Sequence, residues 1–183
     1  MMKYRVKKIC DIDEQLFAET YSNLSEDQHT YIGCKREDKQ KQSLAARAVL
    51  GELIGISKLC CLNTDPSGKP YLFGGTPYIS LSHSGEYVAA AVSDTPVGID
   101  IQCYRPMVDS HIERLCSNDE AEYLKTQPRS EFFRLWTAKE AYIKCFEVLF
   151  FDVREKSFLR PSEEYELIFE QNDDYALTVI KKN

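Results

Sequence analysis

The chain lacks several features that mark whole classes of protein. No apolar run approaches the ~20 residues needed to cross a bilayer, and the first residues contain no apolar segment long enough for a secretion signal. We therefore expect a cytoplasmic protein that does not associate with membranes. The net charge of -6 also lacks the basic excess of general nucleic-acid binders, so nucleic acid is not an expected partner.

Cysteine and histidine patterns typical of metal sites are also missing. The seven cysteines include no C-x-x-C pair, and the three histidines do not have metal-ligand spacing. We expect neither a zinc site nor a disulfide framework, but reduced and mostly buried thiols. No linker rich in proline, glycine or serine divides the 183 residues, so any two halves should pack tightly together.

The string "VGIDIQ" (97–102) has the period-two alternation of a strand. Val97, Ile99 and Ile101 should point to one face. Asp100 and Gln102 should lie ~7 Å apart on the other, polar face. Taken alone, the string is equally consistent with an ordinary strand after a turn.

The string "FFRLWTAKEAYIK" (132–144) has the ~100° periodicity of an amphipathic helix. Glu140 lies at the edge of its apolar sector and Lys144 one turn further along the same rim. Lys139 projects into the sector, where a charge needs a partner. Carboxylates on a strand and on a helix rim, with lysines nearby, suit a hard cation and a phosphorylated ligand. In isolation, Glu140 and Lys144 also read as an ordinary helical ion pair.

The pattern of elements predicts an α+β fold with an internal repeat. We expect helices at 42–57, 112–125 and 132–144, and strands at 4–9, 78–82, 87–92, 97–102, 157–159, 165–169 and 175–180. Two similar segments, 78–92 and 165–180, each have the pattern of a hairpin in which both strands begin with a tyrosine. The chain should therefore form two similar halves, 1–96 and 97–183. Each half would be a helix packed on a small antiparallel sheet, and the two halves together would have pseudo-twofold character.

Four strings in this order resemble a known family. "GKPYL" (68–72), "ISLSHSGEYVAAAV" (79–92), "VGIDIQ" and "WTAKEAYIK" are similar to the ordered motifs of the 4′-phosphopantetheinyl transferases of the surfactin-synthetase-activating type. The resemblance covers about residues 47–144. It implies a pseudodimer with the active site in the cleft between its halves.

The resemblance also implies a reaction and its participants. The phosphopantetheine arm of coenzyme A would move onto a serine of an acyl or peptidyl carrier protein of fatty-acid, polyketide or nonribosomal-peptide machinery, releasing 3′,5′-ADP. Mg²⁺ would be the cofactor and the enzyme would be a monomer. The first half would hold the nucleotide of coenzyme A, and the second half the metal and catalytic residues.

The metal ligands and catalytic residues follow from the motif positions. Asp100 and Glu140 match the family's metal ligands, and Gln102 stands where many relatives have a third acidic ligand. Asp100, Glu140 and Lys144 would be catalytic. Because Gln102 carries no charge, Glu140 or a water that it orients is the better candidate for the general base.

The coenzyme A contacts implied by the resemblance come from both halves. They are Arg47, Lys69, Ser82, His83, Lys139 and Lys144. For Lys139, a structural ion pair under the helix is an equally open interpretation. A basic patch could dock an acidic carrier or be a solvated loop: Lys35, Arg36, Lys39 and Lys41.

One departure from the family and two alternative functions stay open. The G-x-G-L turn that commonly follows the second motif is replaced by a hydrophobic cluster, for which core packing is favoured over carrier docking: Phe146, Leu149, Phe150 and Phe151. The chain could be a degenerate relative that binds coenzyme A or a carrier without transfer. It could also be a structural interaction protein in which Lys139 and Glu140 form a buried pair. The joint presence of Asp100, Glu140 and Lys144 favours an enzyme.

Overall fold

The two halves of the chain repeat one order of elements: a strand, then helices, then an antiparallel hairpin. The computed structural model describes residues 1–106 and 108–183. The first half contains β1 (Lys3–Lys8), η1 (Ile9–Asp11), α1 (Glu14–Ser22), α2 (Glu26–Gly33), α3 (Glu37–Ile54), η2 (Ile56–Cys61), β2 (Leu62–Thr64), β3 (Pro70–Leu72), β4 (Tyr78–Ser84) and β5 (Tyr87–Ser93). The second contains β6 (Val97–Cys103), α4 (Asp109–Leu115), α5 (Asn118–Leu124), α6 (Ser130–Phe146), α7 (Phe150–Arg154), β7 (Tyr165–Gln171) and β8 (Tyr175–Lys182).

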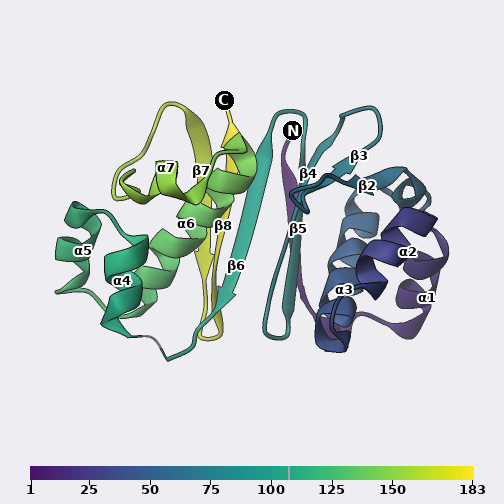
Figure 1. The fold of residues 1–183 in the computed structure, drawn as a ribbon, viewed down its shortest axis with the longest axis horizontal. Helices are drawn as coiled ribbons and strands as arrows, with labels where there is room; N and C mark the ends of the chain where they lie inside the picture. Colours follow the sequence, from purple (N-terminus) through teal and green to yellow (C-terminus); the bar gives the residue numbers. More distant parts are fainter. Residues whose placement is uncertain (107) are drawn as a thin grey trace.

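Each half builds a three-stranded antiparallel sheet of the same topology. The strand orders are β1-β5-β4 and β6-β8-β7, so the last strand of each half lies in the centre of its sheet. The sheets lie in the middle of the molecule, with α1 to α3 on one outer side and α4 to α7 on the other (Figure 1). The predicted α+β class and pseudo-twofold arrangement are confirmed, with a third strand beside each expected hairpin.

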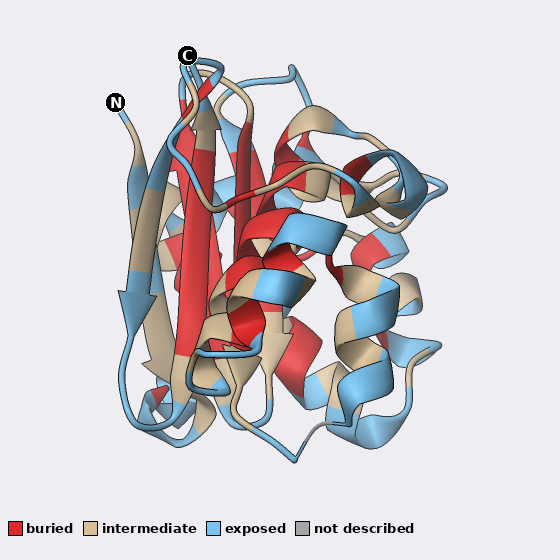
Figure 2. Ribbon diagram, turned by 90° about the vertical axis from the view of Figure 1, so that its left-hand side faces the viewer, coloured by how far each residue is buried: buried red, intermediate tan, exposed pale blue. Residues whose placement is uncertain are grey.

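Three apolar cores stabilise the fold. One lies in each half between its helices and its sheet, and the third joins the two sheets. In the third core, Val97, Ile99 and Ile101 of β6 pack with Ala89 and Ala91 of β5, which confirms the period-two prediction for β6. Figure 2 shows the buried residues concentrated in the strands and on the helix surfaces next to them.

The opposite face of β6 is covered by α6 at very short range. A β-carbon on Gly98 would lie 1.9 Å from the carbonyl oxygen of Ala141 and 2.7 Å from the amide nitrogen of Cys145. Only glycine leaves room for this approach of helix backbone to strand backbone. Gly98 therefore brings the middle of α6 against the strand that carries Asp100.

A row of three serine hydroxyls joins β4 to β6 across the two halves. Ser80, Ser82 and Ser84 accept hydrogen bonds from alternate backbone N–H groups of β6, at 3.0, 3.3 and 3.0 Å. Each serine is 19 residues before its partner, so the two strands run parallel. This serine ladder satisfies the N–H groups on the free edge of β6 and fixes its register against β4.

Two predicted elements are wrong, and contacts of Glu120 are found at both places. The helix expected over 112–125 is two helices, because Ser117 caps α5 in a capping box with Glu120. The segment 157–159 is not a strand. Instead, the backbone N–H of Phe158 donates to the Glu120 carboxylate at 2.9 Å.

The first half holds more helix than the sequence suggested. Two helices occupy the polar segment before residue 37, and the side chains of Asp13 and Ser25 cap their N-termini. The expectation of mostly buried thiols is wrong, because four of the seven free cysteines are exposed: Cys10, Cys34, Cys60 and Cys61. None of the helices in the described part of the chain is long and apolar enough to cross a membrane.

Candidate functional site

Asp100 is the centre of the candidate site, and three side chains hold its carboxylate. Its Oδ1 accepts from the Ser82 hydroxyl at 2.7 Å and pairs with the Lys144 ammonium at 2.7 Å. Its Oδ2 accepts from the Gln102 side-chain amide at 2.9 Å. The Asp100 side chain is only 4% exposed. The orientation of the Asp100 carboxylate is therefore set by three elements: its own strand β6, the neighbouring strand β4 and the helix α6.

Ser82 acts on the carboxylate rather than facing solvent. Its hydroxyl donates to Asp100 and accepts from the backbone N–H of Ile101, so both capacities are used within the protein. The residue is buried. Its placement is that of a positioning residue for Asp100, whereas a nucleotide contact was expected from the sequence.

Glu140 lies one turn before Lys144 on α6 and is half-buried. Burial raises the pKa of its carboxyl above the ordinary 4.5, and the negative charge of Asp100 raises it further, while Lys144 lowers it in part. Two carboxylates that repel each other in a partly buried site are an arrangement that a bound cation relieves.

The donor set at this position fits a hard cation. Asp100 and Glu140 supply carboxylate oxygens, and the Gln102 side chain can add a carbonyl oxygen beside them. Within residues 1–106 and 108–183, no group of three His, Cys, Asp or Glu side chains could hold a metal ion. Two protein carboxylates with substrate oxygens and water are sufficient for Mg²⁺, which keeps much of its hydration.

Lys144 connects the carboxylates to a cavity between the halves. Its ammonium also donates to the backbone carbonyls of Leu81 and Ile99, at 3.4 and 2.9 Å. Lys144 and Lys69, from opposite halves, line the same cavity of about 430 Å³. The other lining residues are Asp65, Ser67, Gly68, Pro70, Ser80, Leu81, Ile143, Glu147, Val148 and Leu149. Both lysines are paired with carboxylates, Lys144 with Asp100 and Lys69 with Glu147, so an anionic ligand would compete with these carboxylates for the ammonium groups.

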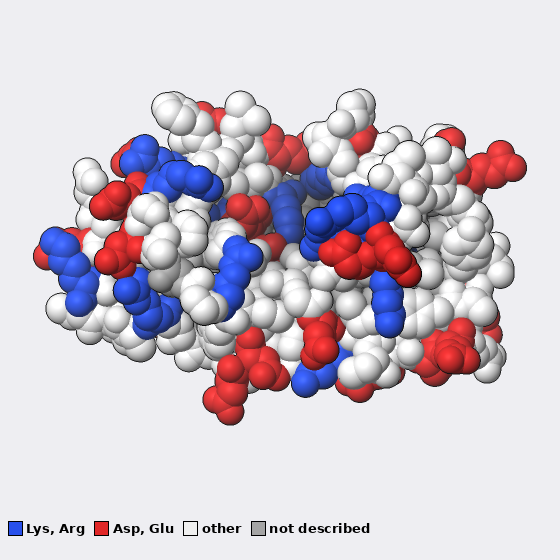
Figure 3. Space-filling model, turned by 60° about the horizontal axis from the view of Figure 1, so that its bottom comes forward, with Lys and Arg blue, Asp and Glu red and all other residues white. Residues whose placement is uncertain are grey.

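His83 lies among lysines. Burial lowers the pKa of its imidazole below the ordinary 6.5, and the charges of Lys39, Lys144 and Lys35 lower it further. Its Nδ1 is buried and finds no hydrogen-bond partner among the described residues. Figure 3 shows one face of the molecule hollowed near its middle, with both basic and acidic side chains around the hollow. A bound anion would offset the positive charge of the lysines near His83, although the chain as a whole is acidic.

Arg47 is buried, so its side chain does not lie on the protein surface. Its guanidinium donates twice to Gln28 Oε1, at 3.0 and 2.7 Å, and also bonds the hydroxyl and carbonyl oxygens of Ser43. Burial lowers the pKa of Arg47 to about 10. Its guanidinium and the Lys35 ammonium both lie over the ring of Tyr31, at 5.6 and 4.1 Å. Arg47 therefore supports the basic region from within.

Lys139 points away from the cavity, into the core of the second half. Its ammonium pairs with Glu120 at 2.9 Å and donates to three backbone carbonyls, those of Val153, Arg154 and Lys156. The side chain is 1% exposed. The expectation that Lys139 contacts coenzyme A is therefore wrong in this structure, and the alternative structural ion pair is the one observed. Its partner is Glu120, not the Glu140 of the structural-protein alternative.

The hydrophobic cluster at the end of α6 and after it divides into a partly buried and an exposed part. Phe146 stacks on Tyr142 with ring centroids 4.3 Å apart, as core packing predicts. Leu149 and Phe151 are 74% and 82% exposed, which core packing does not predict. Leu149 also lines the cavity that holds Lys144, so the cluster borders the candidate site.

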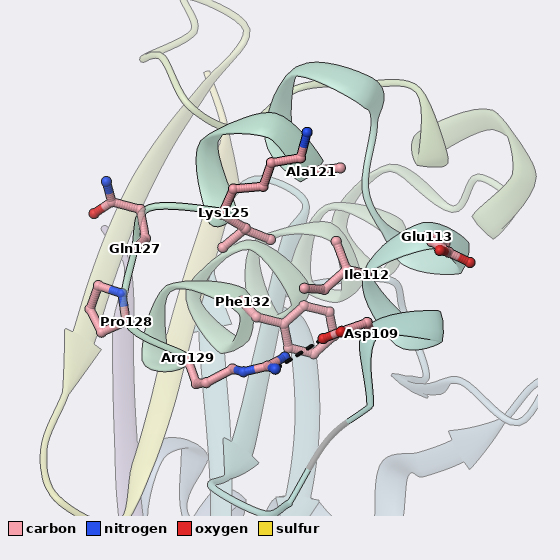
Figure 4. Close-up of a pocket in the computed structure, with 10 residues that line it drawn as sticks. Asp109, Ile112, Glu113, Ala121, Lys125, Gln127, Pro128, Arg129 and Phe132 are labelled. Carbon is pink, nitrogen blue, oxygen red and sulfur yellow. Dashed lines mark ion pairs between the residues drawn. The ribbon is translucent and has the colours of Figure 1, made fainter.

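A second cavity lies elsewhere in the second half. It occupies about 460 Å³ between α4, α5 and the start of α6. Figure 4 shows the ion pair of Asp109 and Arg129 on one side, with the two groups 2.9 Å apart. None of the sequence-predicted site residues lines it, so the candidate site is the one around Asp100.

Several residues that shape the site were not singled out from the sequence. Ser80 and Ser84 belong to the serine ladder, and their alternation with Ser82 in "ISLSHS" is the signal that could have revealed it. Glu147 pairs with Lys69 across the cavity at 2.6 Å. No local sequence pattern predicts this contact, because the two residues are 78 positions apart in the chain.

Comparison with known proteins identifies the family that the chain resembles. The family model for the 4′-phosphopantetheinyl transferase superfamily matches residues 96–181, which include Asp100, Glu140 and Lys144. The chain is 32% identical over 146 residues to the 4′-phosphopantetheinyl transferase psf-1 of Bacillus pumilus, covering 76% of this chain and 59% of the relative.

Two further relatives carry the same description. The chain is 27% identical to 4′-phosphopantetheinyl transferase gsp of Aneurinibacillus migulanus, covering 95% of this chain and 77% of that protein. It is 34% identical to 4′-phosphopantetheinyl transferase Sfp of Bacillus subtilis (strain 168), covering 45% of this chain and 39% of the relative. The chain thus spans between about two fifths and three quarters of these relatives. It belongs to the 4′-phosphopantetheinyl transferase superfamily.

Proposed function

We propose that this protein transfers the 4′-phosphopantetheine arm of coenzyme A to a serine of an apo acyl or peptidyl carrier protein and releases 3′,5′-ADP. The observation that carries the proposal is the assembly of Asp100, Glu140 and Lys144 beside a cavity lined by a second lysine, Lys69. Such a transfer depends mainly on positioning and on neutralising phosphate charge.

Asp100 and Glu140, with Gln102, would hold Mg²⁺. When bound, Mg²⁺ supplies positive charge to the pyrophosphate oxygens of coenzyme A. Gln102 already donates to Asp100, which keeps its side chain on this face of β6. With a neutral amide in place of a third carboxylate, the site carries two protein charges toward the cation.

Glu140 and Lys144 are suited to move the protons of the reaction. Glu140, or a water that it orients, would accept the serine hydroxyl proton, because Gln102 offers no carboxylate for that role. The serine oxygen then bonds the β-phosphorus of coenzyme A, and the bond to the bridging oxygen breaks. Lys144, which lines the cavity, would stabilise the charge left on the departing 3′,5′-ADP.

His83 and Lys69 would hold the nucleotide end of coenzyme A. The positive charges of Lys35, Lys39 and Lys144 near His83 support a phosphate contact there. Arg47 would keep Tyr31 and α2 in place behind these groups. In this assignment the first half, 1–96, serves the nucleotide and the second half, 97–183, serves the metal and the transfer.

The same proposal extends to assembly and location. The cavity is lined by residues of both halves of one chain, which supports a monomeric enzyme. The seven free thiols support a reducing compartment, the cytoplasm.

The test is incubation with coenzyme A, Mg²⁺ and a panel of apo carrier proteins from fatty-acid, polyketide and nonribosomal-peptide systems, followed by intact mass measurement. We expect the phosphopantetheine mass increment on at least one carrier. A folded protein that binds coenzyme A but modifies no carrier would instead be a non-catalytic relative, and the proposal would fail.

A further inference from the structure

We propose that Glu147 is a displaceable internal competitor for the anionic substrate: its carboxylate occupies Lys69 and must leave before the ligand can use that lysine. This inference rests on the proposed function, because it identifies Lys69 as a ligand contact. It assigns to Glu147 control over ligand affinity, and no part in the bond-breaking step.

The ion pair of Glu147 and Lys69 bridges the two halves at the cavity. Lys69 lies in the turn between β2 and β3, and Glu147 directly follows the last residue of α6. Their charged atoms are 2.6 Å apart. Both residues line the cavity of Lys144, and both line a neighbouring cavity of about 200 Å³ on the side of β3. The pair therefore lies between two hollows that an extended ligand could join.

The backbone conformation does not explain an acidic residue at this position. Glu147 has φ 55° and ψ 40°, and its N–H donates to the Ile143 carbonyl as the C-terminal cap of α6. This left-handed conformation favours glycine. Glu147 is also the only residue other than glycine with positive φ in the described ranges. What Glu147 adds to the cap is its carboxylate, and that group contacts Lys69.

The two lysines of the cavity are paired with carboxylates that differ greatly in exposure and in the number of side chains that hold them. Asp100, the partner of Lys144, is 4% exposed and held by Ser82 and Gln102. Glu147 is 71% exposed, and Lys69 is its one side-chain partner among the described residues. The Glu147 carboxylate can therefore swing into water without breaking other bonds, whereas Asp100 cannot.

A phosphate group of the ligand would displace the Glu147 carboxylate from Lys69. A phosphate group offers more charge and more acceptor oxygens to an ammonium than a carboxylate does. The exposed ion pair that it must break is weak, because ion pairs in contact with water contribute little to stability. Removing the Glu147 charge should thus raise ligand affinity about twofold to fivefold, by leaving Lys69 unpaired in the free protein.

The experiment is a double-mutant cycle on binding. Dissociation constants for coenzyme A are measured by calorimetry for the wild type, Glu147→Gln, Lys69→Gln and the double variant at low ionic strength. We expect Glu147→Gln to bind coenzyme A about threefold more tightly. In the Lys69→Gln background the same substitution should change affinity by less than the error of the measurement. Equal or weaker binding by Glu147→Gln overturns the inference, and so does an undiminished gain without Lys69.

A matched control separates this effect from a general change in charge. Glu166 on β7 is also an exposed carboxylate in an ion pair, with Lys181 at 3.2 Å, and lines neither cavity. Glu166→Gln removes the same charge and should leave the affinity for coenzyme A unchanged. An equal gain from both substitutions would mean that net charge alone is responsible, which overturns the inference.

A second variant tests the backbone argument and guards against a folding artefact. Glu147→Gly removes the carboxylate and relieves the left-handed position, so it should raise the melting temperature and tighten coenzyme A binding together. Carrier modification by the wild type with no affinity gain in either Glu147 variant overturns this inference alone. A wild type that binds but does not transfer overturns the proposed function, while the binding cycle still decides the role of Glu147.

Discussion

The carboxylate of Asp100 and the ammonium of Lys144 lie 2.7 Å apart, although 44 residues separate them in the chain. Asp100 belongs to β6, an edge strand of its sheet, and Lys144 belongs to α6, the helix that covers this strand. Their contact depends on the distance between these two backbones, which Gly98 sets by meeting Ala141 without a β-carbon. The family motif thus holds a steric requirement next to its charged residues, and both can be tested.

Replacing Gly98 by alanine should destabilise the protein and disturb the site. The added β-carbon overlaps helix backbone, which cannot rotate away, so the free energy of unfolding should fall by about 3 kcal/mol. Denaturant unfolding measures the loss. Gly33→Ala is the control, because a β-carbon there meets nothing within 4 Å, and it should change stability by less than about 1 kcal/mol. Similar effects at both positions would contradict the close-contact argument.

The two carboxylates should be far more important for transfer than Gln102. Asp100→Asn or Glu140→Gln should reduce kcat/KM by at least about a hundredfold, because each removes a charge that would hold the cation. Gln102→Ala should cost about tenfold or less, as it removes a neutral donor to Asp100. Steady-state kinetics on a modified carrier gives the ranking, and a larger loss from Gln102→Ala would reverse the assignment.

Gln102→Glu should make the protein more dependent on Mg²⁺. A third carboxylate beside Asp100 adds repulsion without the metal and a ligand with it. We expect a lower melting temperature in chelator and a larger upward shift on adding Mg²⁺ than in the wild type. If both shifts equal those of the wild type, position 102 does not face the cation.

Glu140 should impose a pH dependence on stability in the absence of metal. Its pKa is raised in the folded state by burial and by Asp100, so the folded protein holds this proton more tightly than the unfolded chain. The resulting stabilisation is complete below the ordinary pKa of 4.5 and is lost as pH rises through the raised value. Unfolding curves from pH 4 to 7 should therefore show the wild type losing stability relative to Glu140→Gln. Parallel curves would mean that the carboxyl is not perturbed.

His83 should distinguish coenzyme A from its 3′-dephospho form. Contacts remote from the reacting bond act on ground and transition states alike, so His83→Ala should raise KM more than it lowers kcat. The variant should also lose most of the wild-type preference for coenzyme A. His111→Ala, on α4, serves as the control histidine and should keep that preference. Equal discrimination by wild type and His83→Ala would make His83 a structural residue.

Lys139 should affect stability and leave substrate affinity unchanged. Lys139→Met leaves the Glu120 carboxylate buried without its cation, which should reduce the free energy of unfolding by about 3–5 kcal/mol. The double variant with Glu120→Gln should recover part of this loss. Lys125→Met, which breaks an exposed pair with Glu122, should cost under about 1 kcal/mol. A raised KM for coenzyme A in folded Lys139→Met would restore Lys139 to the substrate site.

Local patterns in the sequence predicted the elements that carry the site, but not all of their partners. The period-two alternation of β6 and the periodicity of α6 follow from which side chains are buried, so Asp100, Glu140 and Lys144 could be placed in advance. The partner of Lys139 could not, because Glu120 lies on a different helix whose boundary depends on a capping serine. The Lys69–Glu147 pair likewise depends on how the halves pack.

The serine ladder links the junction between the halves to the Asp100 carboxylate through the Ser82 hydroxyl. Ser82 uses one hydroxyl both to fix β6 against β4 and to donate to the Asp100 carboxylate. A cation that draws on the carboxylate oxygens alters the bond that Ser82 donates, and hence the bond that it accepts from β6. Amide exchange at Ile101 should therefore report cation binding, although this N–H lies on the strand backbone and would not itself be a ligand.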